Sequence, residues 1–236
     1  MVRLSIFSIA FGLIVGCSKP FYQNIPPQPI LNQFSLCYEN NEVEAANVLR
    51  FDGYYKEQMI ISNYDITGNT LLSIDTSYRN IVFFKDGIVQ MDIWDSNLER
   101  TKKGQTDIQL YVDDLIINPK VRQVFLESRE WGIFRIVNDT IIIQYFNHPA
   151  RLAPWYAIEA KFKIKDSTSL ERVMSRKMGI TDDERERQQS RKDISVVRNP
   201  ATFVPLNNIP PSDCWLKRQK WFWCNEDDWI NYMNKH

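Results

Sequence analysis

Residues that commonly carry acid–base, metal or nucleophilic chemistry are sparse in this chain of 236 residues. Its two histidines are His148, in an Asn-His-Pro sequence, and His236, the last residue. No histidine or cysteine pair has zinc-ligand spacing, and the acidic run 182–186 lacks the glycine and periodic oxygens of a calcium loop. Asp113 and Asp114 are adjacent, and we expect them on a strand, where neighbours point to opposite faces. We therefore expect no enzyme, no metal site and no cofactor.

Cysteine is the other residue type with possible chemistry, and the chain has four: Cys17, Cys37, Cys214 and Cys224. A disulfide between Cys214 and Cys224 would close a small loop near the carboxyl end and leave Cys37 as an odd thiol. Other pairings with Cys37, or three reduced and buried thiols, are the alternatives. The spacing lacks the Cys-x-x-Cys pattern that tunes thiolates, so we do not expect a redox pair.

Aromatic side chains are the remaining candidates for a binding site. Trp155 and Tyr156 follow Pro154 at the start of an expected strand, and Trp221 and Trp223 share one face of an expected last strand. Such side chains stack on sugar rings, line apolar pockets or anchor protein interfaces, and they also fill cores. These four are our candidate ligand or interface aromatics.

The elements that must position these residues are mostly β-strands joined by short turns. Residues 81–84 and 88–94 flank Asp86-Gly87, and residues 131–136 and 140–146 flank a second short turn, which predicts two hairpins. Residues 140–146 are apolar on both faces, so this strand must be covered twice or line a cavity. Further strands are expected at 48–58, 108–117, 156–164 and 215–223. The pattern indicates an antiparallel sheet and not βαβ units.

Helical signals are confined to the second half of the chain. Thr181-Asp182-Asp183-Glu184 matches a capping box before the polar segment 185–193, which predicts a polar helical excursion. Residues 199–211 contain four prolines and predict extended linker or edge structure. Asn225 is expected to cap a short C-terminal helix, whose Trp229, Ile230 and Met233 would dock on the sheet.

Composition limits the partners. Lysine plus arginine and aspartate plus glutamate both number 29, and no basic patch stands out, so nucleic acid is not an expected partner. The length suits one sizeable core.

The first residues have the pattern of a secretory signal peptide. Arg3 precedes an apolar run from Leu4 to Val15, which is too short to cross a bilayer. The sequence Leu13-Ile14-Val15-Gly16-Cys17 resembles the lipobox of bacterial lipoproteins. That resemblance implies cleavage before Cys17, a diacylglycerol thioether on its sulfur and acylation of the new amino terminus. Ser18 after the cysteine favours the outer membrane in that family.

The resemblance divides the chain into three parts. Residues 1–16 would be the signal peptide, 17–47 the lipidated amino terminus with a proline-rich spacer and lead-in, and 48–236 a single mainly β domain. The mature chain would lose one positive charge, Arg3, and would carry a net charge of about −1.

The domain is also weakly similar to lipocalin-like small barrels, and the whole chain to uncharacterised envelope lipoproteins. Lipocalins have Gly-x-Trp on their first strand, whereas this chain has Gly53-Tyr54-Tyr55. The fold class we expect is an antiparallel sheet or small lipocalin-like barrel with a short C-terminal helix. The resulting hypothesis is a membrane-anchored envelope lipoprotein that binds a small apolar or glycan ligand or an envelope protein. The alternative is a structural or assembly accessory lipoprotein without a ligand pocket.

Overall fold

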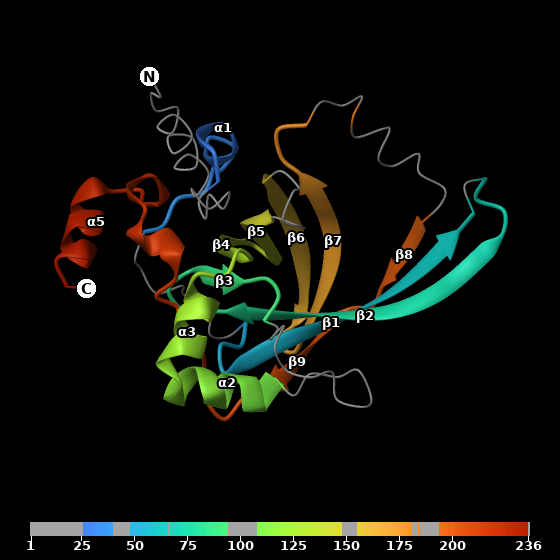
Figure 1. Cartoon of the computed structure of the whole chain (residues 1–236), viewed down its shortest axis with the longest axis horizontal. Helices are drawn as coiled ribbons and strands as arrows, with labels where there is room; N and C mark the ends of the chain where they lie inside the picture. The colour runs from blue at the N-terminus through green and yellow to red at the C-terminus, as the bar shows by residue number, and fades with distance from the viewer. Residues whose placement is uncertain are drawn as a thin grey trace, which may run out of the picture.

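An antiparallel β-barrel forms the body of the protein in the computed structural model (Figure 1). The structure describes residues 26–39, 48–65, 67–93, 108–147, 155–180, 184 and 194–235. The strands are β1 (Gly53–Tyr64), β2 (Leu71–Phe83), β3 (Ile88–Gln90), β4 (Trp131–Val137), β5 (Thr140–Asn147), β6 (Tyr156–Asp166), β7 (Ser169–Lys177), β8 (Ile194–Arg198) and β9 (Ala201–Pro205). The helices are α1 (Gln28–Leu31), α2 (Ile108–Ile117), α3 (Pro119–Leu126) and α5 (Glu226–Met233), with 3₁₀ turns η1 (Trp215–Arg218) and η2 (Lys220–Phe222). The expected mainly β fold is confirmed.

Closure of the barrel depends on β1, which is paired along both edges. One edge pairs with β2 from Tyr55 to Tyr64. The other edge pairs with β9 through Gly53–Lys56 and then with β8 through Met59–Asn63. Because β2, β3, β4, β5, β6, β7 and β9 are neighbours in that order, eight strands close into a ring and β8 lies outside it. The closed ring is consistent with the lipocalin-like architecture. Beyond the ring, β1, β2 and β8 project as an extension (Figure 1).

Both predicted hairpins are confirmed. Gly87, with φ 85°, lies in the turn between β2 and β3. Asn138, with φ 57°, lies in the turn between β4 and β5. Positive φ angles give tight turns the twist that the flanking strands require, and glycine and asparagine adopt them most readily.

The inside of the barrel is filled by an interior cluster of buried side chains from the strands and from Leu49. Its members are Leu49, Tyr55, Ile81, Phe83, Val89, Met91, Phe134, Ile141, Ile143, Tyr145, Ile158, Ala160, Phe162, Leu170 and Ala201. Alternate residues of a strand face the same side. On β1, therefore, Glu57 and Met59 face inward with Tyr55.

A second, outer cluster lies on the opposite face of the sheet, where the helices and the two terminal segments cover it. It includes Leu31, Tyr38, Ile88, Tyr111, Leu115, Phe125, Trp131, Ile133, Phe146, Trp155, Trp215, Leu216, Phe222 and Trp223. Strand β5 contributes Ile143 and Tyr145 to the interior cluster and Phe146 to the outer one. The prediction that this doubly apolar strand is covered twice is confirmed.

Residues 108–117 form helix α2, so the prediction of a strand there is wrong. Ile108, Tyr111, Val112 and Leu115 are buried on one side of the helix. Their spacing follows the helical period of 3.6 residues, and the apolar face packs in the outer cluster. Asp113 and Asp114 are accordingly helical neighbours and not strand neighbours.

The expected last strand, 215–223, is also wrong. This segment forms the 3₁₀ turns η1 and η2, and its only β pairing is an isolated parallel bridge between Tyr38 and Trp223. Buried Trp215, Leu216, Phe222 and Trp223 all enter the outer cluster, so both faces of the segment are used for packing. A strand would have turned half of them away.

Strands β7 and β8 lie in segments for which no element was expected, and β9 lies within 199–211, where extended linker or edge structure was expected. Strand β7 follows β6 directly, and β8 and β9 lie within 194–205. The C-terminal helix α5 is confirmed, because the Asn225 side chain accepts a hydrogen bond of 2.9 Å from the Asp227 amide. Its docking on the sheet is not: Ile230 and Met233 are exposed, and α5 contacts η1 instead.

The barrel domain begins earlier than residue 48. Within residues 26–39, which we expected to be spacer and lead-in, Leu31 and Tyr38 are buried in the outer cluster. The Gln144 side chain of β5 accepts hydrogen bonds of 2.9 and 3.0 Å from the amides of Ser35 and Leu36. This segment is therefore part of the folded domain. None of the helices in the described residues is long and apolar enough to cross a membrane.

Candidate ligand-binding site

Two of the four candidate aromatics are core residues. Trp155 is 8% exposed and packs edge-on against Phe146. Trp223 is 6% exposed, lies edge-on to Tyr38 at 4.7 Å between ring centroids, and donates an indole hydrogen bond of 2.8 Å to the Lys217 carbonyl. Their burial assigns them to packing of the outer cluster, the alternative that the sequence left open.

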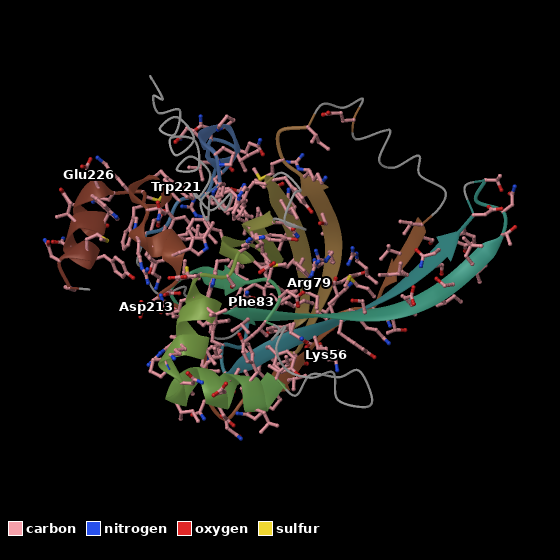
Figure 2. The ribbon with its side chains drawn as sticks, in the orientation of Figure 1. Lys56, Arg79, Phe83, Asp213, Trp221 and Glu226 are labelled. Carbon is pink, nitrogen blue, oxygen red and sulfur yellow. A yellow bond between two sulfur atoms is a disulfide. The ribbon has the colours of Figure 1, made fainter. Side chains whose placement is uncertain are left out.

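The other two aromatics are half-buried and lie in separate places. Trp221, labelled in Figure 2, borders a pocket of about 220 Å³ that is otherwise lined by residues 28–37. Its indole nitrogen is buried without a hydrogen-bond partner in the described residues. Tyr156 packs against the interior cluster. The four aromatics thus do not form one binding surface.

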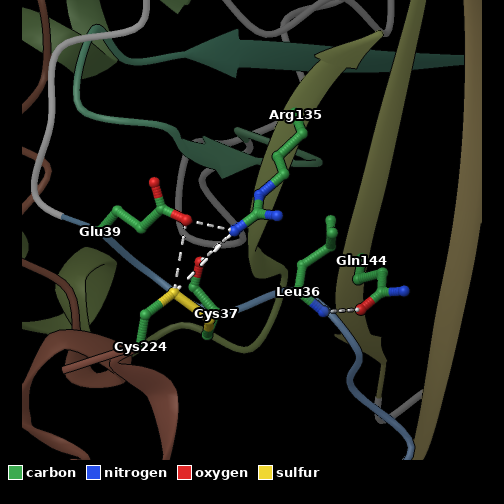
Figure 3. A network of polar contacts seen from close by, with 6 residues as sticks. All are labelled: Leu36, Cys37, Glu39, Arg135, Gln144 and Cys224. Atoms are coloured by element: carbon green, nitrogen blue, oxygen red, sulfur yellow. Dashed lines mark hydrogen bonds and ion pairs between the residues drawn. A yellow bond between two sulfur atoms is a disulfide. The ribbon is translucent and has the colours of Figure 1, made fainter.

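The disulfide joins Cys37 to Cys224 across 187 residues, so the expected Cys214–Cys224 pairing is wrong. Figure 3 shows this bond beside the ion pair between Arg135 and Glu39, whose N···O distance is 2.7 Å. The parallel bridge of Tyr38 with Trp223 brings the two cysteines together. The bond fastens the amino-terminal segment to the carboxyl-terminal one.

Cys214 is the free cysteine of the described residues, and it is buried. Burial raises the pKa of its thiol to about 12, so the reactive thiolate is disfavoured at neutral pH. Cys214 therefore has the environment of an inert core residue.

A buried ion pair inside the barrel was not expected from the sequence. Glu57 of β1 accepts two hydrogen bonds of 2.7 Å from Arg172 of β7, one on each carboxylate oxygen. The side chains of Glu57 and Arg172 are 1% and 3% exposed. The remaining nitrogen of Arg172, Nη1, has no hydrogen-bond partner among the described residues. A buried donor left without a partner costs about 1–3 kcal/mol, and more when the group is charged.

Two further arginines surround the same glutamate. Arg198 of β8 lies 3.7 Å from the Glu57 carboxylate, and its side chain is 33% exposed. Its Nη1 contacts the sulfur of Met59, which is a weak acceptor. Burial and repulsion by Arg172 lower the pKa of Arg198. Burial is the larger cause of this shift, and the neighbouring Arg172 charge acts in the same direction.

Arg79 of β2 is directly opposite Glu57 in the β1–β2 register. Figure 2 places Arg79 and Phe83 on one side of this sheet and Lys56 on the other. Burial acts to lower the pKa of Arg79, but attraction to Tyr145, Asp92 and Glu57 and a hydrogen bond to Tyr145 raise it above its usual value. Arg79 is therefore held as a buried cation.

Lys177 at the end of β7 adds a fourth cation to this end of the barrel. It is directly opposite Ile158, a member of the interior cluster, and residues in that relation share a face of the sheet. Its ammonium lies 4.2 Å from the ring centroid of Tyr156. Tyr156 is thus the one predicted aromatic that belongs to the barrel interior.

Asp92, just after β3, is the second carboxyl group of this region. Burial raises its pKa to about 6, and repulsion by Glu130 and Glu57 acts in the same direction, while Arg79 opposes the rise. The Asn80 amide also donates to the Asp92 carboxylate at 3.4 Å. A carboxyl group with this pKa gains or loses its proton in mildly acidic solution.

These residues define what we name the polar mouth: Glu57, Arg79, Asp92, Arg172, Lys177 and Arg198, at the end of the barrel from which the β1–β2 hairpin projects. Among the described residues, four cations face these two carboxylates, and Glu130 lies close enough to repel Asp92. Deeper in the barrel the side chains are mainly apolar, and the Arg172 guanidinium lies 4.5 Å from the ring centroid of Phe162 there. The interior therefore changes from apolar to cationic along the barrel axis.

The polar mouth could have been located from charged residues that alternate with apolar residues along a strand and so share their face of the sheet. Glu57 alternates with Tyr55 and Met59, and Arg79 alternates with Ile81 and Phe83. On a half-buried strand this phase puts the charge inside. The expected strand at 81–84 stopped short of Arg79, and no strand was expected at Arg172 or Arg198.

Several predicted features lie outside the described residues: Cys17 and the signal peptide, His148, His236, and the capping-box segment 181–193 apart from Glu184. Within the described residues, no group of three or more histidine, cysteine, aspartate or glutamate side chains could hold a metal ion. Comparison with family models, curated proteins and solved structures finds no match for the chain.

Proposed function

We propose that this protein is a lipid-anchored binding protein of the bacterial cell envelope, with a barrel that takes a small ligand at its polar mouth. The observation that carries the proposal is the polar mouth itself. A barrel of about eight strands is wide enough for its own side chains or for one small ligand. Buried charges are expensive, so a protein that buries the Glu57–Arg172 pair and gathers four further ionisable side chains around it needs a reason beyond stability.

The anchor part of the proposal rests on the lipobox resemblance around Cys17. Two or more acyl chains on one cysteine would hold the protein durably at a membrane, whereas a single chain gives only marginal binding. The disulfide between Cys37 and Cys224 supports an exported protein, because disulfides persist in oxidising compartments.

The anchor is tested by expression in a bacterial host, with the wild type beside Cys17→Ala. We expect a lipid-sized mass increment and partitioning into the detergent phase for the wild type, and neither for the variant. A wild type without added mass that stays in the aqueous phase would contradict the anchor.

Ligand binding is tested separately on the folded domain by titration calorimetry with decanoate and decanol, chosen because each has an apolar chain and a small polar head. Saturable binding of either compound at one molecule per protein would support the proposal. Binding of neither compound nor of inorganic phosphate, together with native mass spectra that show no retained small molecule, would overturn it in favour of a structural accessory.

A further inference from the structure

The donors of the polar mouth are only partly used by the protein. Glu57 gives both of its oxygens to Arg172, through hydrogen bonds of 2.7 Å each. Arg198 is left with a 3.7 Å contact to the same carboxylate and with the Met59 sulfur. Arg172 Nη1 has no partner among the described residues.

Lys177 has no carboxylate partner among the described residues either, and its ammonium rests on the Tyr156 ring. Arg172, Ser175 and Lys177 lie opposite Phe162, Ala160 and Ile158 in the β6–β7 register. Since those three β6 residues belong to the interior cluster, the two β7 cations share the inner face of the barrel. Arg198 reaches the same space from the β1 side, because it is opposite Met59.

Two arginines with spare donors thus lie beside the same glutamate, Arg172 on β7 and Arg198 on β8. Lys177 shares their face of the sheet but lies five residues beyond Arg172 along β7. A neutral ligand could satisfy hydrogen bonds there but would not offset the excess positive charge, and a cation would add to it. An oxyanion does both, and guanidinium groups match the geometry of carboxylate and phosphate oxygens.

We infer that the polar mouth binds an oxyanion, the carboxylate or phosphate group of a ligand, between Arg172 Nη1 and Arg198. This inference rests on the proposed function and adds that its ligand is negatively charged. The oxyanion is either a free anion or the head group of an amphiphile, whose chain would stay at the mouth because the barrel's own side chains fill its interior.

The test is titration calorimetry at low ionic strength with three probes: decanoate, decanol and inorganic phosphate. The variants are Arg198→Gln and Lys177→Gln. The matched control is Arg176→Gln, which removes the same charge from the neighbouring position of β7, where Arg176 pairs with Glu159 at 2.9 Å on the outer face. Arg172 is left intact in all of them because its ion pair is needed for folding.

We expect decanoate or phosphate to bind the wild type, with decanol at least tenfold weaker than decanoate. Arg198→Gln should weaken anion binding by about tenfold, the effect of losing one charged hydrogen bond. Lys177→Gln should have a smaller effect, because Lys177 lies further along β7, and Arg176→Gln should change binding less than twofold. Competition by phosphate would identify a free oxyanion, and binding of decanoate alone would identify an amphiphile head group.

Equal affinity for decanoate and decanol, insensitive to both mouth variants, would overturn the oxyanion and leave ligand binding standing. An equal loss in Arg176→Gln would overturn it too, because a general charge effect would then explain the result. Absence of binding by all three probes would overturn the proposed function together with this inference.

Discussion

Glu57 is the carboxylate at the centre of the ion pairs inside the barrel. Its carboxylate is the hydrogen-bonded partner of Arg172 and the nearest carboxylate to Arg198. Removing one member of a buried ion pair leaves the other charge unpaired, which costs more than the pair itself contributes. Arg172 and Arg198 therefore depend on this one side chain for their counter-charge, whereas Arg79 is also attracted to Tyr145 and Asp92.

The first prediction follows for Glu57→Gln. Its free energy of unfolding should fall by about 3–5 kcal/mol, because the Arg172 and Arg198 guanidinium groups lose their counter-charge in a buried site. Urea unfolding measures the change. The control is Glu39→Gln, whose pair with Arg135 is exposed and should contribute below about 1 kcal/mol. Equal losses in the two variants would contradict the buried network.

The second prediction concerns the pH dependence caused by Asp92. Burial raises its pKa from 3.8 to about 6 in the folded protein. Well below pH 3.8 the carboxyl group is protonated in both states. As the pH rises from about 4 to about 6, the unfolded chain ionises and the folded protein resists, so stability falls by up to about 3 kcal/mol.

The side chain introduced by Asp92→Asn cannot ionise, so the variant should not lose stability over this pH range. The unfolding free energy of the variant relative to the wild type should therefore rise between pH 4 and pH 6 and stay constant above. Urea unfolding at pH 4, 5, 6 and 7 measures it. Asp139→Asn is the control, because hydrogen bonds from Thr140 and Lys163 lower the pKa of Asp139 and give the opposite trend. Parallel curves for wild type and Asp92→Asn would refute the assignment.

At the scale of elements, the two terminal segments are joined to each other where they cover the outer face of the sheet. Residues 26–39 and 215–223 run side by side, joined by the Tyr38–Trp223 bridge and the Cys37–Cys224 bond. A bond that closes 187 residues restricts the unfolded chain strongly, and disulfides typically contribute about 2–4 kcal/mol.

The third prediction is that Cys37→Ser and Cys224→Ser each have an unfolding free energy about 2–4 kcal/mol below that of the oxidised wild type. The double variant should lose no more than either single variant. Chemical unfolding with and without dithiothreitol checks this, since reduction should abolish the difference from the wild type.

Peptide mapping should find Cys214 as the free thiol, alkylated only after unfolding. A Cys214–Cys224 peptide would contradict the structure.

At the scale of the whole molecule, the sequence was informative where one pattern dominated. The turns at Gly87 and Asn138 predicted the hairpins, and the doubly apolar strand β5 predicted cover on both faces. The same reasoning failed at 215–223, because apolar residues on every face fit a buried helix, turn or strand equally well. Tertiary packing in the outer cluster decided between them. At 108–117 the buried residues do have helical spacing, which the strand prediction overlooked.

The disulfide and the polar mouth could not be predicted from local sequence patterns, for a different reason. Cys37 and Cys224 are brought together by a long-range parallel bridge, for which the sequence has no local signal. Glu57, Arg172 and Arg198 come from three strands that meet only when the barrel closes. In each strand taken alone, a charged residue resembles a solvent-facing one.

The most direct test of the oxyanion-binding barrel is the NMR spectrum of arginine side-chain Nε–H groups during a titration with decanoate, followed by one with inorganic phosphate. We predict that the Arg172 and Arg198 signals shift and saturate with at least one probe, whereas those of Arg135 and Arg176, on the outside, stay in place. Signals of Arg172 and Arg198 that remain unmoved by both probes, or that move no more than those of Arg135 and Arg176, would contradict the account.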